Sequence, residues 1–126
     1  MKILVVDDEL DVQALFEQRF RREIRSGALA FSFAFSGEEA LDYLRGHTSE
    51  VVLILSDINM PGMSGLELLR RVRTEHKPPP PPRVMMITAY GDDASRTQAL
   101  ALGAEDFLTK PVDFAALKEK LLALPA

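Results

Sequence analysis

Short apolar runs alternate along the chain with longer stretches in which apolar residues recur every three or four positions. The short runs are typical of buried strands, and the longer spacing is typical of amphipathic helices. Five runs predict strands at residues 3–6, 29–35, 51–55, 84–87 and 105–108. The third and fourth runs are apolar throughout, which indicates central strands buried on both faces. The second run alternates large and small residues and the fifth begins with an acid, so we expect both at sheet edges.

Five helices are predicted after these strands. Gly27 and Gly103 are expected to end the first and fourth helices. Capping residues precede three others, at Ser36, Ser64 and Asp113, and the two serines have a glutamate three positions later. The helical stretches carry, in chain order, Val12, Leu15, Phe16, Phe20 and Ile24; Leu41 and Leu44; Leu66, Leu69 and Val72; residues 92–102; and Phe114, Leu117 and Leu121.

The regular alternation of strand and helix predicts an α/β fold, a doubly wound five-stranded parallel sheet with helices on both faces. Central and edge positions together give the strand order 2-1-3-4-5 of a flavodoxin-like (βα)5 domain. A chain of 126 residues is the length of one domain, which we expect to cover residues 1–124 with no second domain. Ligands of such sheets bind beyond the carboxyl ends of the strands, where the first and third strands meet.

Composition narrows the classes of protein. The chain has no cysteine, which excludes disulfides, thiolate catalysis and zinc–cysteine sites. No apolar run is long enough for a membrane span or a secretory signal, so we expect a cytoplasmic protein without membrane contact. The net charge of -4 argues against direct nucleic-acid binding. One basic cluster is expected to be a solvated helix face rather than a nucleic-acid patch: Arg19, Arg21, Arg22 and Arg25.

Chemically distinctive side chains stand at the ends of four predicted strands. Asp7 and Asp8 follow the first, Asp57 the third, Thr88 ends the fourth, and Lys110 follows the fifth. Parallel strands bring these side chains to one edge of the sheet. Three converging carboxylates repel one another, and the cluster favours a hard cation, Mg²⁺ with Mn²⁺ as an alternative. The competing interpretation, that the first two acids only cap the first helix, remains open for one of them.

Asp57 is the candidate nucleophile of this site. A carboxylate can accept a phosphoryl group to form an aspartyl phosphate. Phosphoryl transfer needs positive charge on the phosphoryl oxygens, which a metal ion and Lys110 would supply, and Thr88 would add a hydroxyl donor. Taken singly, that lysine is more often a surface residue and that threonine a strand-end cap. Their joint placement is what favours phosphate chemistry.

Four motifs in this order resemble a known family. They are Val-Val-Asp-Asp-Glu at residues 5–9, the segment Ser56 to Gly65, Thr88-Ala89 and Lys110-Pro111. These motifs closely resemble the receiver domains of bacterial two-component response regulators, the CheY-like superfamily. The resemblance covers essentially the whole chain. It implies a receiver that accepts a phosphoryl group from a sensor histidine kinase or a phosphotransfer protein, and it implies no turnover enzyme.

The resemblance also assigns the metal and phosphate roles. Asp57 is implied to be the phosphoacceptor and a metal ligand. Asp8 would ligate the metal directly, Asp7 directly or through water, and Asn59 through its backbone carbonyl. Lys110 would bind the phosphoryl group, and the bond from it to the following proline is cis in the family.

A switch and a tuning position follow from the same resemblance. Thr88 would move toward the phosphate, and Phe107 would turn inward to fill the vacated space. The surface of the last two helices and the fifth strand would then change, for a phosphorylation-dependent homodimer or a downstream effector. Asn59 and Tyr90 match positions that flank the path of hydrolytic water, and we expect Tyr90 to shield the phosphate.

Two other functions compete with this prediction. A small Mg²⁺-dependent phosphatase could also use an aspartyl phosphate, although its nucleophile usually follows the first strand and the chain has no insertion for a cap. The second alternative is a receiver-like interaction module that does not accept phosphate. The run Pro78 to Pro82 departs from the family pattern, and we expect a stiff polyproline connector there, with docking to an aromatic groove as the less favoured interpretation. His47 and His76 are expected at the surface, away from the acids.

Overall fold

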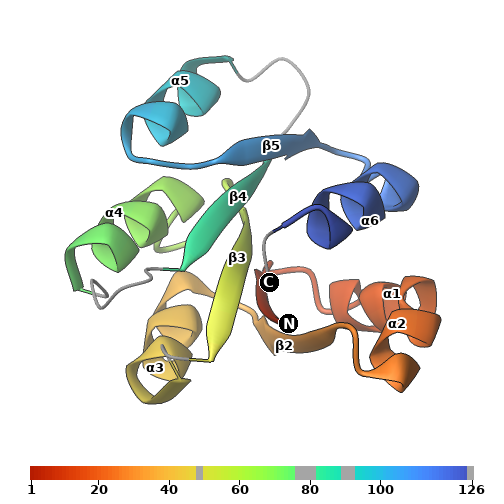
Figure 1. Cartoon of the computed structure of the whole chain (residues 1–126). Helices are drawn as coiled ribbons and strands as arrows, with labels where there is room; N and C mark the ends of the chain where they lie inside the picture. Colours follow the sequence, from red (N-terminus) through yellow and green to blue (C-terminus); the bar gives the residue numbers. More distant parts are fainter. Residues whose placement is uncertain (48–49, 76–81, 89–92, 125–126) are drawn as a thin grey trace.

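The computed structural model describes residues 1–47, 50–75, 82–88 and 93–124, and it contains one five-stranded parallel sheet (Figure 1). The strand order is β2-β1-β3-β4-β5, which confirms the doubly wound topology predicted from the sequence. Strands β3 and β4 are buried almost throughout, while β2 and β5 form the two edges. The strands are β1 Lys2–Val6, β2 Ala30–Ala34, β3 Val51–Asp57, β4 Arg83–Thr88 and β5 Asp106–Thr109.

Helices cover both faces of the sheet (Figure 1). Alternate residues of each strand point to opposite faces, so the apolar core forms two layers. One layer packs beneath α3, α4 and α5, and the other beneath α1, α2 and α6. None of the described helices has the length and apolar character needed to cross a membrane. The helices are α1 Val12–Arg19, α2 Arg21–Ser26, α3 Gly37–His47, α4 Gly65–Glu75, α5 Asp93–Ala101 and α6 Phe114–Leu122.

The first predicted helix is two helices, so the described residues contain six helices rather than five. Phe20 separates α1 from α2 with φ -110° and ψ 24°. Its ring is buried and lies 5.9 Å from the ring of Phe16 and 5.3 Å from that of Phe31. Burying this ring therefore accompanies a change in chain direction. The predicted stripe is wrong at Leu15 and Ile24, which are exposed.

Side-chain caps begin three helices where the sequence predicts them. The Ser36 hydroxyl accepts from the backbone N–H of Glu39 at 3.1 Å, and the Glu39 carboxylate reaches back to the N–H of residue 35. Ser64 accepts from the N–H of Glu67 at 3.2 Å, whereas the Glu67 side chain pairs with an arginine instead. Asp113 accepts two N–H groups at the start of α6. These local contacts set where each helix starts after its strand.

Strand register brings the predicted site residues to one edge of the sheet. Val6 pairs with Ser56, and Asp57 pairs with Ile87 one step further along. Thr88 ends β4 and lies opposite the last residue of β5. The residues that immediately follow β1 and β5 therefore meet the end of β3 at the same level.

A close backbone contact holds the loop after β3. The Gly65 N–H donates to the Ile58 carbonyl at 2.8 Å, which returns the chain to the strand end as α4 begins. A Cβ atom on Gly65 would lie 2.2 Å from the carbonyl oxygen of Asp57, well inside van der Waals distance. Only glycine leaves room for this approach, so the loop geometry at Asp57 depends on it.

Candidate functional site

Three carboxylates meet at the carboxyl edge of the sheet. One oxygen from each of Asp7, Asp8 and Asp57 lies within 4.8 Å of the others. Asp7 and Asp57 are each 3% exposed, whereas Asp8 is open to solvent. The structure thus brings together the three acids that the sequence placed at the ends of β1 and β3, and it leaves one side of the cluster open.

Asp57 is held at both carboxylate oxygens. Oδ2 accepts a hydrogen bond from Lys110 Nζ at 2.9 Å, and Oδ1 accepts the backbone N–H of Asn59 at 3.3 Å. The lysine comes from the far end of the chain, 53 positions away in sequence. The parallel sheet alone brings these two residues together.

Asp7 belongs to the acid cluster and does not cap the first helix. Its Oδ1 accepts the N–H of Glu9 at 3.0 Å, within the loop after β1. Asp11 occupies the cap position of α1 and makes no side-chain cap there. Burial raises the pKa of the Asp7 carboxyl, and the nearby Asp57 charge adds to the rise against the hydrogen bond from Glu9. The competing helix-cap interpretation therefore fails for this residue.

Lys110 faces three carboxylates. Besides its bond to Asp57, Nζ lies 3.9 Å from Asp7 Oδ2 and 3.7 Å from Glu9 Oε1. Burial alone would lower the pKa of the lysine, but the hydrogen bond that Lys110 donates to Asp57 and the surrounding negative charges outweigh burial, and the pKa is raised. The lysine therefore stays charged. The peptide bond from Lys110 to Pro111 is cis, the isomer implied by the family resemblance.

Glu9 is a site neighbour that the sequence reasoning did not single out. It follows the two aspartates directly, and this run of three acids was the available signal. Its carboxylate is largely exposed, so it adds negative charge at the mouth of the cluster rather than in its centre.

Thr88 lies at the end of β4 with a buried side chain. Its exposed fraction is 1%, and its Oγ1 has no hydrogen-bond partner among the described residues. A buried hydroxyl without a partner is costly, since its hydrogen bonds to water are lost without replacement. The Thr88 carbonyl also accepts the Lys110 N–H at 2.9 Å, which ties the two strand ends together. The hydroxyl is therefore free to donate to an incoming acceptor.

Phe107 on β5 packs partly against the core beneath α5. The guanidinium of Arg96, on α5, lies 5.2 Å from the centre of this ring, within cation–π range. Sequence reasoning singled out Phe107 but not Arg96, because nothing in the local pattern indicates that an exposed arginine covers a ring on another element. The contact couples α5 to β5.

Several predicted features lie beyond this geometry. Tyr90, His76 and Pro78 to Pro81 fall outside the described residues. His47 is partly exposed on α3, where its ring stacks on Tyr43 at 4.2 Å between ring centres and its Nδ1 contacts the Tyr43 carbonyl. It takes no part in the acid cluster.

The acid cluster fits a hard divalent cation. All three side chains offer oxygen ligands, the type that Mg²⁺ prefers, and one of them is open to solvent as an ion that retains waters requires. Among the described residues, Lys110 is the cation paired with this cluster, against four nearby carboxylates that include Glu9. The local excess of negative charge favours binding of a cation.

The site and fold are those of one signalling family. The sequence model of the response regulator receiver domain matches residues 3–122. The chain therefore belongs to the response regulator receiver domain family of two-component systems. It is 36% identical to the response regulator RppA of Synechocystis over 98% of its own length, and 40% identical to the response regulator protein PilR of Pseudomonas aeruginosa over 94%. It spans 50% of the first and 24% of the second.

Solved structures agree with this assignment. The chemotaxis protein CheY4 of Vibrio cholerae superposes with a TM-score of 0.81 at 25% identity, with 98% of each chain covered. The receiver domain of Ssk1 of Saccharomyces cerevisiae, crystallised with the histidine phosphotransfer protein Ypd1, gives a TM-score of 0.83 at 26% identity. That match covers 96% of this chain and 86% of the other. These similarities confirm the predicted family and fold and give no support to the phosphatase alternative.

Proposed function

We propose that this receiver domain accepts a phosphoryl group on Asp57 from a phosphohistidine of a sensor kinase or a phosphotransfer protein. The observation that carries the proposal is the 2.9 Å hydrogen bond from Lys110 Nζ to Asp57 Oδ2 within a cluster of three acids, two of which are buried. A carboxylate that is held in place beside a cation is ready to attack phosphorus, and the cation is ready to offset the phosphoryl charge. The likeness to a receiver crystallised with a phosphotransfer protein supports the choice of donor.

The transfer exchanges one bond for another. A carboxylate oxygen of Asp57 bonds to phosphorus, the bond from phosphorus to the imidazole nitrogen breaks, and its electron pair stays on the nitrogen. Lys110 then donates to a phosphoryl oxygen instead of to the free carboxylate, and the unpartnered Thr88 hydroxyl donates to another. Attack by water later returns the carboxylate and releases phosphate.

Mg²⁺ is the ion we propose for the acid cluster, with Mn²⁺ as an alternative. Asp8 and Asp57 would ligate it, Asp7 would do so directly or through water, and the Asn59 carbonyl would complete the protein ligands. When bound, the cation offsets negative charge on the transferring phosphoryl oxygens.

We propose that phosphorylation changes the conformation of the surface formed by α5, β5 and α6. Movement of Thr88 toward the phosphate would vacate space at the end of β4, and Phe107 would turn into it. The Arg96 contact with that ring would then be lost, so α5 would follow. The new surface would bind a second receiver or a downstream effector.

Asn59 and Tyr90 are proposed to set how long the phosphate lasts. The Asn59 N–H donates a hydrogen bond to Asp57, so the Asn59 side chain begins close to where water would attack the phosphorylated carboxylate. Tyr90 follows Thr88 by two residues, and we propose that its ring shields the phosphate. In a Tyr90→Ala protein the phosphate should be lost faster than in the parent, and an unchanged rate would contradict the shielding role.

We propose a switch without multiple turnover, working in the cytoplasm where sensor kinases present their phosphohistidines. The test is to incubate the chain with acetyl phosphate and Mg²⁺ and to follow intact mass. The expected result is the gain of one phosphoryl group, sensitive to hydroxylamine as acyl phosphates are. The Asp57→Asn protein keeps the shape of the side chain but removes the nucleophile, and it should gain nothing.

Two outcomes would overturn the proposal. The first is no mass gain in the parent, or an equal gain in both proteins. The second is steady release of phosphate from small monoesters, which would restore the phosphatase alternative. A paired assay of labelling and free phosphate distinguishes all of these results in one experiment.

A further inference from the structure

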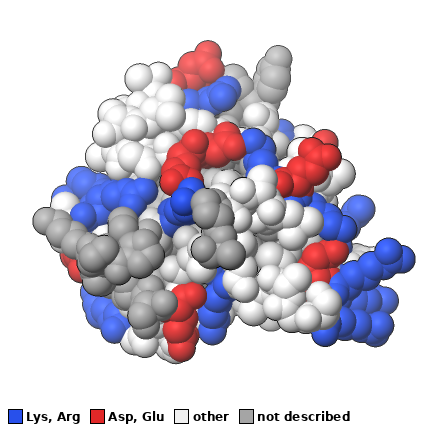
Figure 2. Space-filling model, in the orientation of Figure 1, with Lys and Arg blue, Asp and Glu red and all other residues white. Residues whose placement is uncertain are grey.

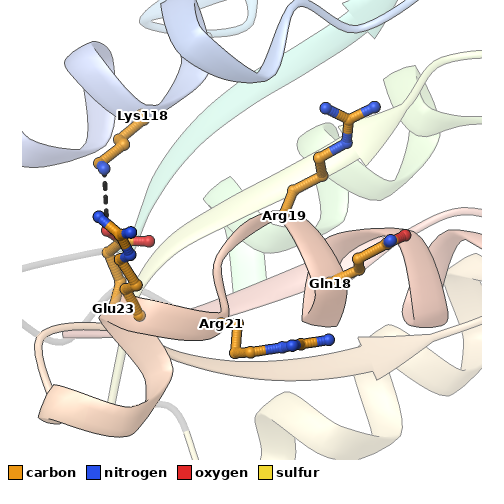
Figure 3. A pocket seen from close by; sticks show the side chains of 6 residues that line it. Gln18, Arg19, Arg21, Glu23 and Lys118 are labelled. Atoms are coloured by element: carbon orange, nitrogen blue, oxygen red, sulfur yellow. Dashed lines mark ion pairs between the residues drawn. The ribbon is translucent and has the colours of Figure 1, made fainter.

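A basic hollow lies between the junction of α1 with α2 and the helix α6 (Figure 3). Its volume is about 460 Å³. Figure 3 shows Lys118 reaching from α6 to Glu23, while Arg19 and Arg21 leave the chain on either side of the helix junction. The residues that line it are Gln18, Arg19, Arg21, Arg22, Glu23 and Lys118.

The hollow is strongly positive. Four of its six lining side chains are cations and one is an acid, in a chain whose net charge is -4. The acid, Glu23, pairs with Lys118 at 2.9 Å and is only 13% exposed. A carboxylate is thus already accommodated at the wall of the hollow, and Gln18 adds an amide that can donate or accept.

Two of the arginines have no such partner. Among the described residues, no carboxylate lies within ion-pair distance of Arg21 or Arg22, and both are exposed. Arg19 is held with its guanidinium 5.5 Å from the centre of the Phe114 ring on α6. The hollow therefore combines one braced arginine with two that are available to an incoming anion.

The break at Phe20 is what creates this arrangement. A single helix would have placed these arginines along one solvated face, as the sequence analysis expected. The change of direction instead puts Arg21 and Arg22 on a second helix beside α6. Figure 2 shows the result as a gathering of lysine and arginine side chains at the lower right, over α1 and α2.

The hollow is separate from the phosphoacceptor site. Helix α1 leaves the carboxyl edge of the sheet and α2 returns the chain to Ala30, which pairs with Lys2 at the start of β1. The hollow is lined by the end of α1, the start of α2 and Lys118, and not by the loop that carries Asp7 and Asp8. None of its lining residues belongs to the acid cluster.

We propose that this hollow docks an acidic peptide segment of a partner protein. Arginine binds carboxylates through two parallel hydrogen bonds, and closely spaced arginines beside a shallow hollow suit consecutive Glu or Asp side chains. Within the chain itself, the Glu23 carboxylate already forms an ion pair with Lys118 at the wall of the hollow. The proposal does not depend on phosphorylation of Asp57.

Nucleic acid is the less favoured occupant. Binding to a phosphate backbone rests on many contacts along an extended basic surface, and the hollow has four lining cations in a chain whose net charge is -4. A peptide with a short acidic run matches the small size of the hollow, and a long polyanion would meet the acids elsewhere on the surface.

The test is fluorescence anisotropy with a labelled hexaglutamate peptide at low salt. The parent should bind the peptide, and added NaCl should weaken the binding because exposed charges are screened. The Arg22→Glu protein should bind about fivefold more weakly, the size of one exposed ion pair. Arg25→Glu is the matched control, since Arg25 lies on the same helix without lining the hollow and the change in net charge is identical.

Three outcomes would overturn the proposal. The parent could fail to bind the peptide, or the two variants could weaken binding equally. The parent could also bind a hexathymidine oligonucleotide or phosphatidylserine vesicles more tightly than the peptide at the same salt concentration. A titration of the parent followed by amide chemical shifts provides a second measurement that needs no variant. Shifts should concentrate at residues 18–23 and 118. Shifts spread evenly over the surface would contradict a defined site.

Discussion

Asp7 is a buried carboxylate, and we expect its charge to favour cation binding while destabilising the metal-free fold. It is 3% exposed and its pKa is raised by burial and by Asp57. The Asp7→Asn change keeps the oxygen that accepts the Glu9 N–H and removes the charge. Without metal we expect the variant to be more stable by about 1 kcal/mol, measured by urea unfolding in EDTA.

With Mg²⁺ added, the parent should become more stable than the Asp7→Asn variant. A ligand that binds only the native state stabilises it, by about 2.7 kcal/mol at a concentration of one hundred times its Kd. The parent should gain most of this stabilisation, and the Asp7→Asn protein should gain little because one of the three acids is neutral. If Mg²⁺ stabilised the two proteins equally, Asp7 would not be a ligand of the metal.

We expect the Thr88 hydroxyl to contribute to the proposed switch and not to the stability of the resting state. It is buried and has no partner among the described residues, so Thr88→Val should leave the unfolding free energy unchanged or raise it by up to about 1 kcal/mol. The variant should still gain a phosphoryl group from acetyl phosphate. A clear loss of stability would show that the hydroxyl makes a hydrogen bond in the resting state.

At the scale of elements, the loop from β3 to α4 depends on Gly65. A Cβ atom there would meet the Asp57 carbonyl at 2.2 Å, so Gly65→Ala must displace the backbone at Asp57, the proposed phosphoacceptor. We expect a loss of about 1–3 kcal/mol in thermal or urea unfolding, together with slower labelling by acetyl phosphate.

Gly46 supplies the matched control for that change. It lies within α3, and nothing within 4 Å would meet an added Cβ atom. Gly46→Ala should therefore stabilise the chain by about 0.5–1 kcal/mol through the unfolded state. If Gly65→Ala and Gly46→Ala changed the stability equally, the close approach at Gly65 would not contribute to the stability of the fold.

An ion pair joins β5 to α6. Burial alone would raise the pKa of the Asp106 carboxyl, but the hydrogen bond from Lys120, with the Phe107 N–H and nearby charges, lowers it below the usual 3.8. A carboxyl with a lowered folded pKa stabilises the fold above its unfolded pKa, and this stability is lost as the pH falls through the folded value.

The corresponding variant should lose stability in a pH-dependent manner. At neutral pH, Asp106→Asn should be less stable by at most about 1 kcal/mol, since both side chains are partly exposed. The difference should shrink as the pH falls below the ordinary value of 3.8, and it should be smaller in a Lys120→Gln background. Urea unfolding across this pH range measures it, and a difference that grew toward acid would contradict the assigned sign.

At the scale of the whole molecule, phosphorylation should change the surface formed by α5, β5 and α6 and leave the rest of the surface largely unchanged. Amide hydrogen exchange with and without acetyl phosphate and Mg²⁺ should differ most over α5, β5 and α6, where Arg96 and Phe107 link elements to the end of β4. Helices α1, α2 and α3 should change little. In the Thr88→Val protein the exchange differences should be lost although Asp57 is labelled, and a full response there would exclude Thr88 as the link.

Most of the architecture could be predicted because it depends on local pattern. Apolar runs of strand length, Ser and Asp caps and the alternation of elements each follow from neighbouring residues, and together they determine a parallel sheet. The first helix was the exception. Its apolar spacing is regular through Phe20, and only the packing of that ring against Phe16 and Phe31 shows why the chain turns there.

The sequence by itself determined the strand order, the three acids, Lys110 and Thr88, because ends of parallel strands must meet at one edge. Tertiary structure decided what each side chain touches: that Asp7 joins the cluster rather than a helix cap, that Glu9 faces Lys110, that Arg96 covers Phe107, and that a run of arginines surrounds a hollow. Such contacts join residues far apart in the chain. They depend on the relative placement of packed elements, which no local pattern of residues encodes.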